Sequence, residues 1–194
     1  MKRFKTFLCA SGFAMTATQA AAGCVKTPEP CLIEQGEYHI ELPENADQTT
    51  PVVVFLHGYG SSGAGVLRNR GMVNAILDRG YALVAPKGTS DAGRDGGSWS
   101  FHPDFPQRRD EAAFIASVIR DVVDRHNVNP DRVLLSGFSI GGSTTSYLAC
   151  QKPDIARAYA PVGGGFWRPH PTDCAGPVQL LHTHGWRDTT VPLE

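Results

Sequence analysis

An α/β fold, with a mostly parallel central sheet and helices on both faces, is predicted from three features of the sequence. Apolar runs that suit strands alternate with segments of helical periodicity, which is the pattern of βαβ units. The runs at 51–56 and 81–85 are continuously apolar, as expected for strands that are buried on both faces. A third run leads into Gly137-Phe138-Ser139-Ile140-Gly141, a pattern typical of a sharp turn between strand and helix.

The remaining elements follow from apolar patterning and from breaker residues. We expect strands at 38–42 (an edge strand that stops at Pro43), 51–56, 81–85 (ended by Pro86), from Arg132 into the turn, 155–162, and 178–181 with a possible extension to His184. We expect helices at 66–79 (stopped by Gly80), at 110–126 and after Ser139. The segment 87–109 is too long for an idle connection, so it is interpreted as a lid or substrate-binding loop, with disorder as the alternative.

Length and charge restrict the class of protein. The chain has 194 residues and a formal net charge of -1, so one domain (23–194) is expected, and neither nucleic acid nor an anionic membrane is expected as a partner. No stretch reaches the roughly 20 apolar residues that span a bilayer, so stable membrane association is not expected. No internal repeat or interdomain linker is visible, and nothing indicates an obligate protein partner.

The first 22 residues have the pattern of a secretory signal peptide. Lys2, Arg3 and Lys5 precede an apolar region, and a small-residue cleavage site follows at 20–22. We therefore expect a secreted or periplasmic protein. A core helix is the less favoured alternative, because the segment lacks a polar face. Lipoprotein processing at Cys24 is a second alternative, weakened because Ala21 stands where such sites usually carry Leu.

Removal of the leader leaves four cysteines, which in an exported protein suggest two disulfides. Three pairings are possible, and we favour Cys24 with Cys31 and Cys150 with Cys174, because each closes a modest loop. Four separate buried thiols are less expected outside the cytoplasm. A metal site is not expected, since the sequence contains no Cys-x-x-Cys pair.

Ser139 is the candidate nucleophile. In a nucleophile elbow, the serine occupies a strained position at the strand end, and the flanking glycines avoid collisions. A serine hydroxyl also needs donors to hold the oxyanion, a base, and a group that orients the base. We expect the oxyanion donors to be the N–H of Ile140 and that of Tyr59, with Gly60 as the alternative to Tyr59.

Asp188 is the candidate orienting acid, because it follows the last predicted strand and because the order of serine before aspartate suits this arrangement. The base is missing, since no histidine follows Asp188. His57 is explained by the oxyanion turn, and surface positions are expected for His39, His102, His126 and His170. His182 and His184 would share one face of a strand, but no third ligand at suitable spacing supports a metal site.

At this point the chain resembles the polyhydroxybutyrate depolymerase-like and feruloyl esterase-like secreted esterases of the α/β-hydrolase superfamily. The resemblance covers roughly residues 24–194. The motifs that carry it are Leu56-His57-Gly58, the segment from Ser136 to Gly142, Ala160-Pro161-Val162-Gly163-Gly164, and His184-Gly185 through Asp188 to Val191-Pro192. It implies Ser139 as nucleophile, Asp188 as acid, and the amides of Ile140 and Tyr59 as oxyanion hole. Nothing in the sequence indicates a metal or organic cofactor.

The resemblance also implies a histidine beyond Glu194, so a C-terminal truncation is expected, without the last strand and the C-terminal helix. Without a base, this polypeptide is expected to be nearly inactive. The strand at 178–181 would then expose an apolar edge, from which poor solubility follows.

Carboxylic esters are the expected substrates, either polyhydroxyalkanoate oligomers or feruloyl and acetyl esters of polysaccharide. Trp99, Trp167 and Trp186, with Phe101 and Phe166, are candidates to line the substrate site, although a role as core or loop anchors is equally compatible with the sequence. Two other hypotheses remain open: a serine peptidase of the same superfamily, and a non-catalytic binding protein that keeps the fold.

Overall fold

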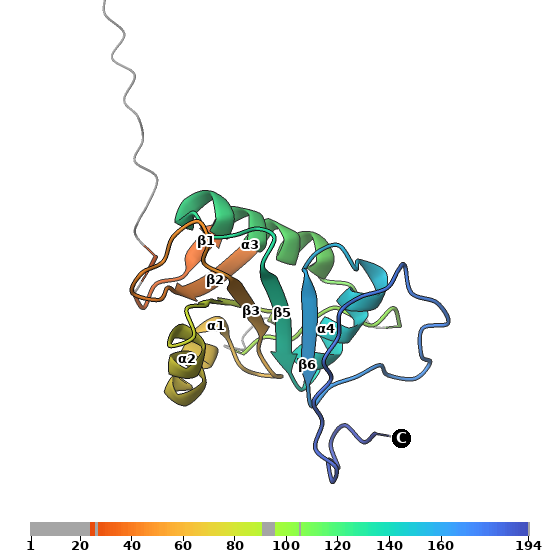
Figure 1. Cartoon of the computed structure of the whole chain (residues 1–194). Helices are drawn as coiled ribbons and strands as arrows, with labels where there is room; N and C mark the ends of the chain where they lie inside the picture. Colours follow the sequence, from red (N-terminus) through yellow and green to blue (C-terminus); the bar gives the residue numbers. More distant parts are fainter. Residues whose placement is uncertain (1–23, 26, 91–95, 105, 194) are drawn as a thin grey trace, which may run out of the picture.

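The computed structural model describes residues 24, 25, 27–90, 96–104 and 106–193 (Figure 1). The predicted leader, residues 1–22, and the part of the predicted substrate loop at 91–95 lie outside this set. Among the described helices, none combines the length and the apolarity that crossing a bilayer would require.

The described strands form one mixed, mostly parallel sheet, as predicted. The strands are β1 (Cys31–Ile33), β2 (Gly36–Glu41), β3 (Val52–Leu56), β4 (Ala82–Pro86), β5 (Val133–Phe138) and β6 (Ala158–Val162). Their order across the sheet is β1-β2-β4-β3-β5-β6. The pairs β1–β2 and β2–β4 are antiparallel, and the other pairs are parallel. The expectation that residues 38–42 form an edge strand is wrong, because β1 pairs with the outer side of β2.

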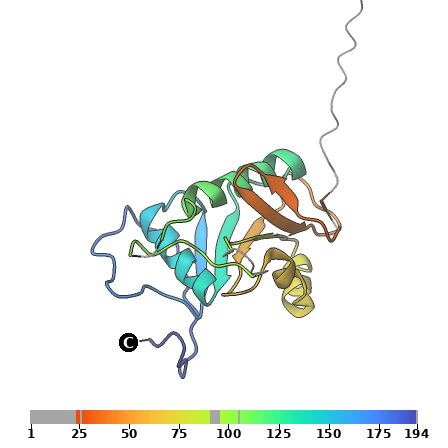
Figure 2. The ribbon, with the colours of Figure 1, turned by 180° about the vertical axis from the view of Figure 1, so that it is seen from behind.

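Helices cover both faces of the sheet, which explains the continuously apolar strands. α3 (Glu111–His126) and α4 (Ile140–Gln151) lie on one face and α1 (Gly63–Leu67) and α2 (Arg70–Leu77) on the other (Figures 1 and 2). Side chains alternate between faces along a strand, so Val52 and Val54 pack toward α3 and α4 while Val53 packs toward α1 and α2. Each face therefore has its own apolar core.

Capping side chains set the helix boundaries. Asp110 precedes α3 and accepts a hydrogen bond from the Ala113 N–H at 2.9 Å, so the helix predicted at 110–126 is confirmed. The single helix predicted at 66–79 is wrong, because the chain turns between α1 and α2. There the side chain of Asn69 accepts from the Met72 N–H and starts a second helix.

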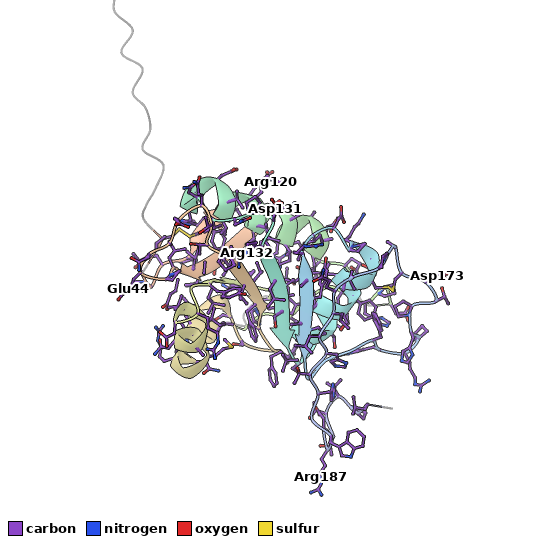
Figure 3. All side chains as sticks on the ribbon, in the orientation of Figure 1. Glu44, Arg120, Asp131, Arg132, Asp173 and Arg187 are labelled. Atoms are coloured by element: carbon purple, nitrogen blue, oxygen red, sulfur yellow. A yellow bond between two sulfur atoms is a disulfide. The ribbon has the colours of Figure 1, made fainter. Side chains whose placement is uncertain are left out.

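Both predicted disulfides are present. Cys24–Cys31 ties the start of the described chain to β1, and Cys150–Cys174 ties the end of α4 to the segment that follows β6. The latter is visible beside Asp173 in Figure 3.

The predicted strand at 178–181 is only partly formed. Its segment runs parallel to β6 through two isolated bridges, Tyr159 with Leu180 and Val162 with Thr183. It is not a regular strand, and it leaves Leu180 51% and Leu181 70% exposed. An exposed apolar edge is therefore present, as expected.

The histidines differ from their predicted surface positions. His170 is exposed, but His39 and His102 are buried and His126 is half-buried. His39 lies under the N-terminal segment, where its Nε2–H donates to the Pro28 carbonyl at 3.2 Å. His102 packs its ring against Tyr147, with centroids 5.8 Å apart.

Candidate active site

Ser139 occupies a strained turn between β5 and α4. Its backbone angles are φ 56° and ψ −122°, a positive φ that costs a non-glycine residue on the order of 1–2 kcal/mol. The Ser139 N–H donates to the Val162 carbonyl at 2.9 Å, which fixes the turn against β6. The Ser139 side chain precedes α4 but does not cap it, and it makes no hydrogen bond to any described residue. The hydroxyl is therefore left for another partner.

Two glycines allow this turn to close. A Cβ on Gly137 would stand 2.5 Å from the Gly141 carbonyl oxygen, and a Cβ on Gly141 would overlap the Leu56 carbonyl oxygen. These are backbone atoms, which cannot move aside as a flexible side chain can. The Gly-x-Ser-x-Gly spacing is thus explained by close packing of β5, α4 and the end of β3.

The turn after β3 lies directly against the serine. A Cβ on Gly58 would stand 3.7 Å from the Ser139 Cβ. Ile140 is the first residue of α4, and its N–H has no acceptor within the helix. The Gly60 N–H donates to the Gly97 carbonyl at 3.0 Å. Gly60, the alternative second donor, is therefore already engaged by a backbone acceptor.

His57 joins this turn to the substrate loop. Its Nδ1–H donates to the Gly58 carbonyl at 2.8 Å, and its Nε2 accepts from the Gly88 N–H at 2.9 Å. The Trp99 indole N–H donates to the His57 carbonyl at 2.9 Å. Burial lowers the pKa of His57, so the ring stays neutral and keeps its one acceptor nitrogen. This supports the interpretation of His57 as part of the oxyanion turn.

Asp188 lies at the same end of the sheet. Its Oδ1 accepts from the N–H groups of Thr190 and Val191, each at 2.9 Å, and these bonds, with the nearby His184, lower the pKa of the carboxyl group. Its Oδ2 faces Gly163, where a Cβ would stand 3.8 Å away. Gly163 follows Val162, the residue that holds the Ser139 amide. The fold thus brings Asp188 and Ser139 to neighbouring strand ends.

His184 and His182 hold the Asp188 loop. The His184 Nε2–H donates to the Val191 carbonyl at 2.6 Å and lies 3.6 Å from Asp188 Oδ2. A carbonyl can only accept, so His184 Nδ1 is the acceptor for the His182 Nε2–H, 3.2 Å away. The sequence analysis missed this positioning role, for which the spacing of His184 and Asp188, four residues apart, was the available signal. Arg187 projects from the tip of the loop, away from the sheet (Figure 3).

No described histidine is placed as the base. All seven histidines of the chain lie in the described part, and none hydrogen-bonds to Ser139. His57 and His184 are committed to the carbonyls above.

A cavity of about 220 Å³ adjoins the elbow. Ile140 and Tyr59 line it together with Trp99, Phe101 and Trp167, and the rings of Phe101 and Trp167 meet edge to face at 5.3 Å. Two of the three predicted substrate-binding tryptophans therefore meet here. Trp186, 90% exposed, does not line this cavity.

A buried ion pair between Arg109 and Glu111 anchors the predicted substrate loop at Ser100, and the sequence analysis missed it. Arg109 donates to Glu111 Oε2 at 2.7 Å, and Glu111 Oε1 accepts from the Ser100 N–H at 3.0 Å. Burial raises the pKa of Glu111 and lowers that of Arg109. A signal was available, because Glu111 occupies the apolar stripe of α3 together with Phe114 and Val118, where a charge needs a partner.

The sheet order, the strained serine at the end of β5 and the acid beyond β6 define the α/β-hydrolase class. The chain belongs to the phospholipase/carboxylesterase family, whose model matches residues 38–194. The crystal structure of esterase PE8 has the same fold, with a TM-score of 0.57 at 24% identity over 82% of this chain and 78% of that one.

Three relatives bear the names of esterases or depolymerases. A bifunctional acetylxylan esterase/xylanase of Neocallimastix patriciarum is 26% identical over 80% of this chain and 22% of its own length. Feruloyl esterase D of Neurospora crassa is 27% identical over 96% of this chain and 69% of its own. Poly(3-hydroxyalkanoate) depolymerase C of Paucimonas lemoignei is 24% identical over 64% of this chain and 30% of its own length. The chain thus spans less than a third of two of these relatives.

Proposed function

We propose that this domain hydrolyses carboxylic esters through an acyl-enzyme on Ser139. The observation that carries the proposal is the strained Ser139, whose hydroxyl has no described partner and whose neighbour Ile140 offers a free helix N-terminal amide. Strain of this kind is held only where the surrounding structure enforces it, and here the packing of Gly137 and Gly141 does so.

The geometry supports a two-step reaction. Ser139 Oγ attacks the ester carbonyl carbon, and the N–H groups of Ile140 and Tyr59 stabilise the resulting oxyanion. The serine proton is transferred to the alkoxide, which leaves as the alcohol. Water then cleaves the acyl-enzyme, which releases the carboxylic acid and restores the serine hydroxyl. The N–H groups of the Asp188 turn bond Oδ1 and not Oδ2, so that Oδ2 can orient a histidine base. None of the seven histidines here takes that place, so we expect the 194-residue polypeptide itself to be nearly inactive.

The cavity beside the elbow supports an ester with an aromatic or sugar-borne acyl group. Its Trp99, Phe101 and Trp167 side chains offer apolar faces beside the two proposed oxyanion donors. The names of the relatives agree with feruloyl or acetyl esters of polysaccharide, and with polyhydroxyalkanoate oligomers as the other substrate class. The two disulfides support a secreted or periplasmic location.

Labelling of Ser139 by a fluorophosphonate tests the nucleophile without requiring turnover. Because the base is missing, the chain should label only slowly at Ser139, over a long incubation with excess reagent, whereas the Ser139→Ala variant should not label there at all. Labelling that is equal in the two proteins would overturn the assignment. Turnover of feruloyl, acetyl and 3-hydroxybutyryl esters by the two proteins should be nearly equal, and a large Ser139-dependent rate would contradict the expected inactivity.

A non-catalytic ester-binding protein is the second candidate, favoured by one observation: no described histidine forms a hydrogen bond to Ser139. It predicts saturable binding of a feruloyl ester, detected by quenching of Trp99 and Trp167 fluorescence, without labelling at Ser139.

A further inference from the structure

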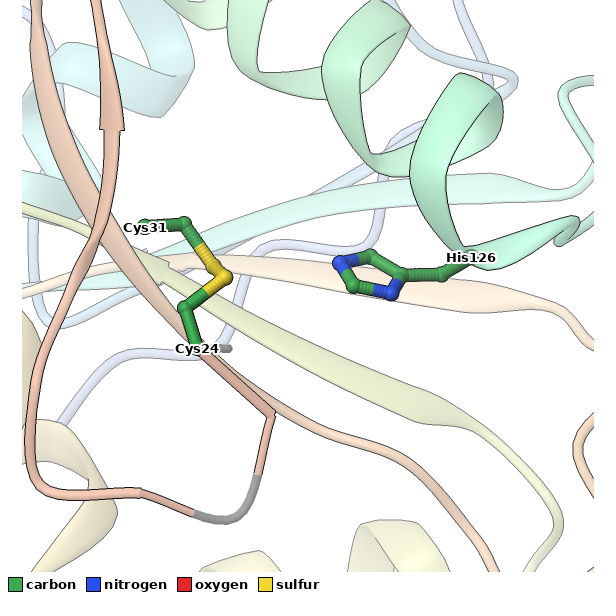
Figure 4. Close-up of side chains that lie close together, drawn as sticks. All are labelled: Cys24, Cys31 and His126. Carbon is green, nitrogen blue, oxygen red and sulfur yellow. A yellow bond between two sulfur atoms is a disulfide. The ribbon is translucent and has the colours of Figure 1, made fainter. Parts of the chain in front are cut away.

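Three potential metal ligands converge far from Ser139. Cys31 begins β1, Cys24 lies in the segment before it, and His126 is the last residue of α3. Their two sulfur atoms and one imidazole nitrogen all lie within 4.8 Å of one another. Figure 4 shows the His126 ring with its outer nitrogen directed at the disulfide. No other such group of three is found in the described part of the chain.

In the protein with the Cys24–Cys31 disulfide intact, no hydrogen bond explains the position of the outer ring nitrogen of His126. Its Nε2 is buried and has no hydrogen-bond partner among the described residues. A buried polar atom without a partner costs roughly 1–3 kcal/mol and calls for an explanation.

We propose that reduction of the Cys24–Cys31 disulfide creates a zinc site formed by Cys24, Cys31 and His126. A dithiol reductant supplies two electrons and two protons, giving two cysteine thiols and an oxidised dithiol. Zn²⁺ then displaces the two thiol protons to solvent and forms two Zn–S bonds and one Zn–N bond with His126 Nε2. The disulfide and the metal exclude each other, because the same two sulfur atoms make both sets of bonds.

The donor set suits zinc. Thiolate and imidazole are the preferred ligands of Zn²⁺, and three protein ligands leave the fourth tetrahedral position to water. Two thiolates, a neutral imidazole and Zn²⁺ carry no net charge, so such a cluster can form where Cys24 and Cys31 are buried. The Cα atoms of the two cysteines are 5.1 Å apart, and Cys24 lies in a short segment before the first strand, so the sulfur atoms can separate to flank a metal.

The sequence could not reveal this site. Cys24 and Cys31 are seven residues apart, so they lack the close spacing of a zinc-binding pair, and His126 comes 95 residues after Cys31. Only the packing of α3 beside β1 and the N-terminal segment brings the three together.

Co²⁺ is the probe for the test, because its tetrahedral thiolate complexes absorb in the near ultraviolet and the visible. The parent protein for this test is the full chain with the substitution Cys9→Ser, which removes the one cysteine outside the described residues. After treatment with a phosphine reductant, the parent should show absorption bands in both the near ultraviolet and the visible with one equivalent of Co²⁺. Zn²⁺ should displace the Co²⁺ and abolish these bands. The His126→Gln variant should bind at least about 10-fold more weakly.

Two controls separate this site from other thiols and imidazoles. The double variant Cys150→Ser/Cys174→Ser and the variant His170→Gln should bind Co²⁺ like the parent. Before reduction no variant should show the bands. Absence of thiolate bands in the reduced parent, or equal affinity of the His126→Gln variant, would overturn the proposal.

Circular dichroism of the same samples covers the case in which reduction loosens the fold. If the reduced chain unfolds and Zn²⁺ restores its spectrum in the parent but not in the His126→Gln variant, metal binding is coupled to folding and the proposal stands. Unfolding that Zn²⁺ does not reverse would overturn it.

Discussion

Substitution of Arg109 by Met should destabilise the protein severely, because it leaves a buried carboxylate without its partner. The Arg109 guanidinium donates to Glu111 Oε2 through two nitrogens at 3.0 and 2.7 Å, and to the Gln35 and Lys87 carbonyls at 3.3 and 3.2 Å. It also lies 3.5 Å from the ring centroid of Phe114. Glu111 is 3% exposed, so water cannot replace what is lost.

Breaking a buried pair from one side costs about 3–5 kcal/mol. The Ser100 N–H still donates to Glu111 in the variant, and the carboxyl can take up a proton, so we expect the lower part of that range. The double variant Arg109→Met/Glu111→Leu removes both charges and should recover most of the loss. Urea unfolding at pH 7, followed by circular dichroism, gives the free energy of unfolding for each protein.

The surface pair of Arg70 and Glu41 supplies the matched control. Arg70 is 54% exposed at its side chain, and the Arg70→Met variant should be hard to distinguish from the parent. If Arg109→Met cost no more than Arg70→Met, or if the double variant were as unstable as the single one, the argument from burial would be refuted.

Three further predictions concern the elbow, the oxyanion turn and the exposed edge. A Gly141→Ala variant should lose about 1–3 kcal/mol in urea unfolding, because its Cβ meets the Leu56 carbonyl, and it should label more slowly with fluorophosphonate. Because the pKa of His57 is lowered in the folded state, the unfolded chain binds a proton at this residue at a higher pH than the folded chain does. Stability should therefore fall as the pH drops below about 6.5, by up to about 1.4 kcal/mol per pH unit from this residue, and His57→Gln should remove that share, whereas an unchanged slope would contradict the neutral ring. Leu181, 70% exposed beside β6, should promote self-association, so Leu181→Lys should shift the size-exclusion profile toward monomer, and a monodisperse parent would count against the idea.

The parts of the fold that the sequence predicts are those encoded locally. The elbow is specified within a few residues, because an apolar strand, two glycines and Ser139 follow one another. α3 carries both an apolar stripe and its Asp110 cap, and the disulfides follow from loop length. Sites at strand ends can also be predicted, because the carboxyl ends of parallel strands meet at one edge of the sheet, and this places both Asp188 and the turn at His57 near the site.

The parts that the sequence does not predict depend on distant partners. β1 has three residues and exists as a strand only through its pairing with β2, so no alternation could reveal it. His39 and His102 are polar residues in loop or edge contexts, and their burial comes from Pro28 in one case and Tyr147 in the other. The apolar pattern continues across the boundary between α1 and α2, so it predicts one helix. The Asn69 side chain instead caps the start of α2 and breaks the helix there.

The Cys150–Cys174 disulfide has a consequence for a chain cut by a protease. The two cysteines are 24 residues apart in the sequence, and the loop that they close contains the exposed residues Arg168 and His170. An exposed loop segment of this kind is a preferred site of proteolytic cleavage. A cut there would divide the molecule into one piece that carries Ser139 and another that carries Asp188. Because sulfur still joins the pieces, they would migrate as one species on a gel without reductant and as two with it. The proposed nucleophile and the proposed acid would remain one covalent unit after the backbone between them is severed.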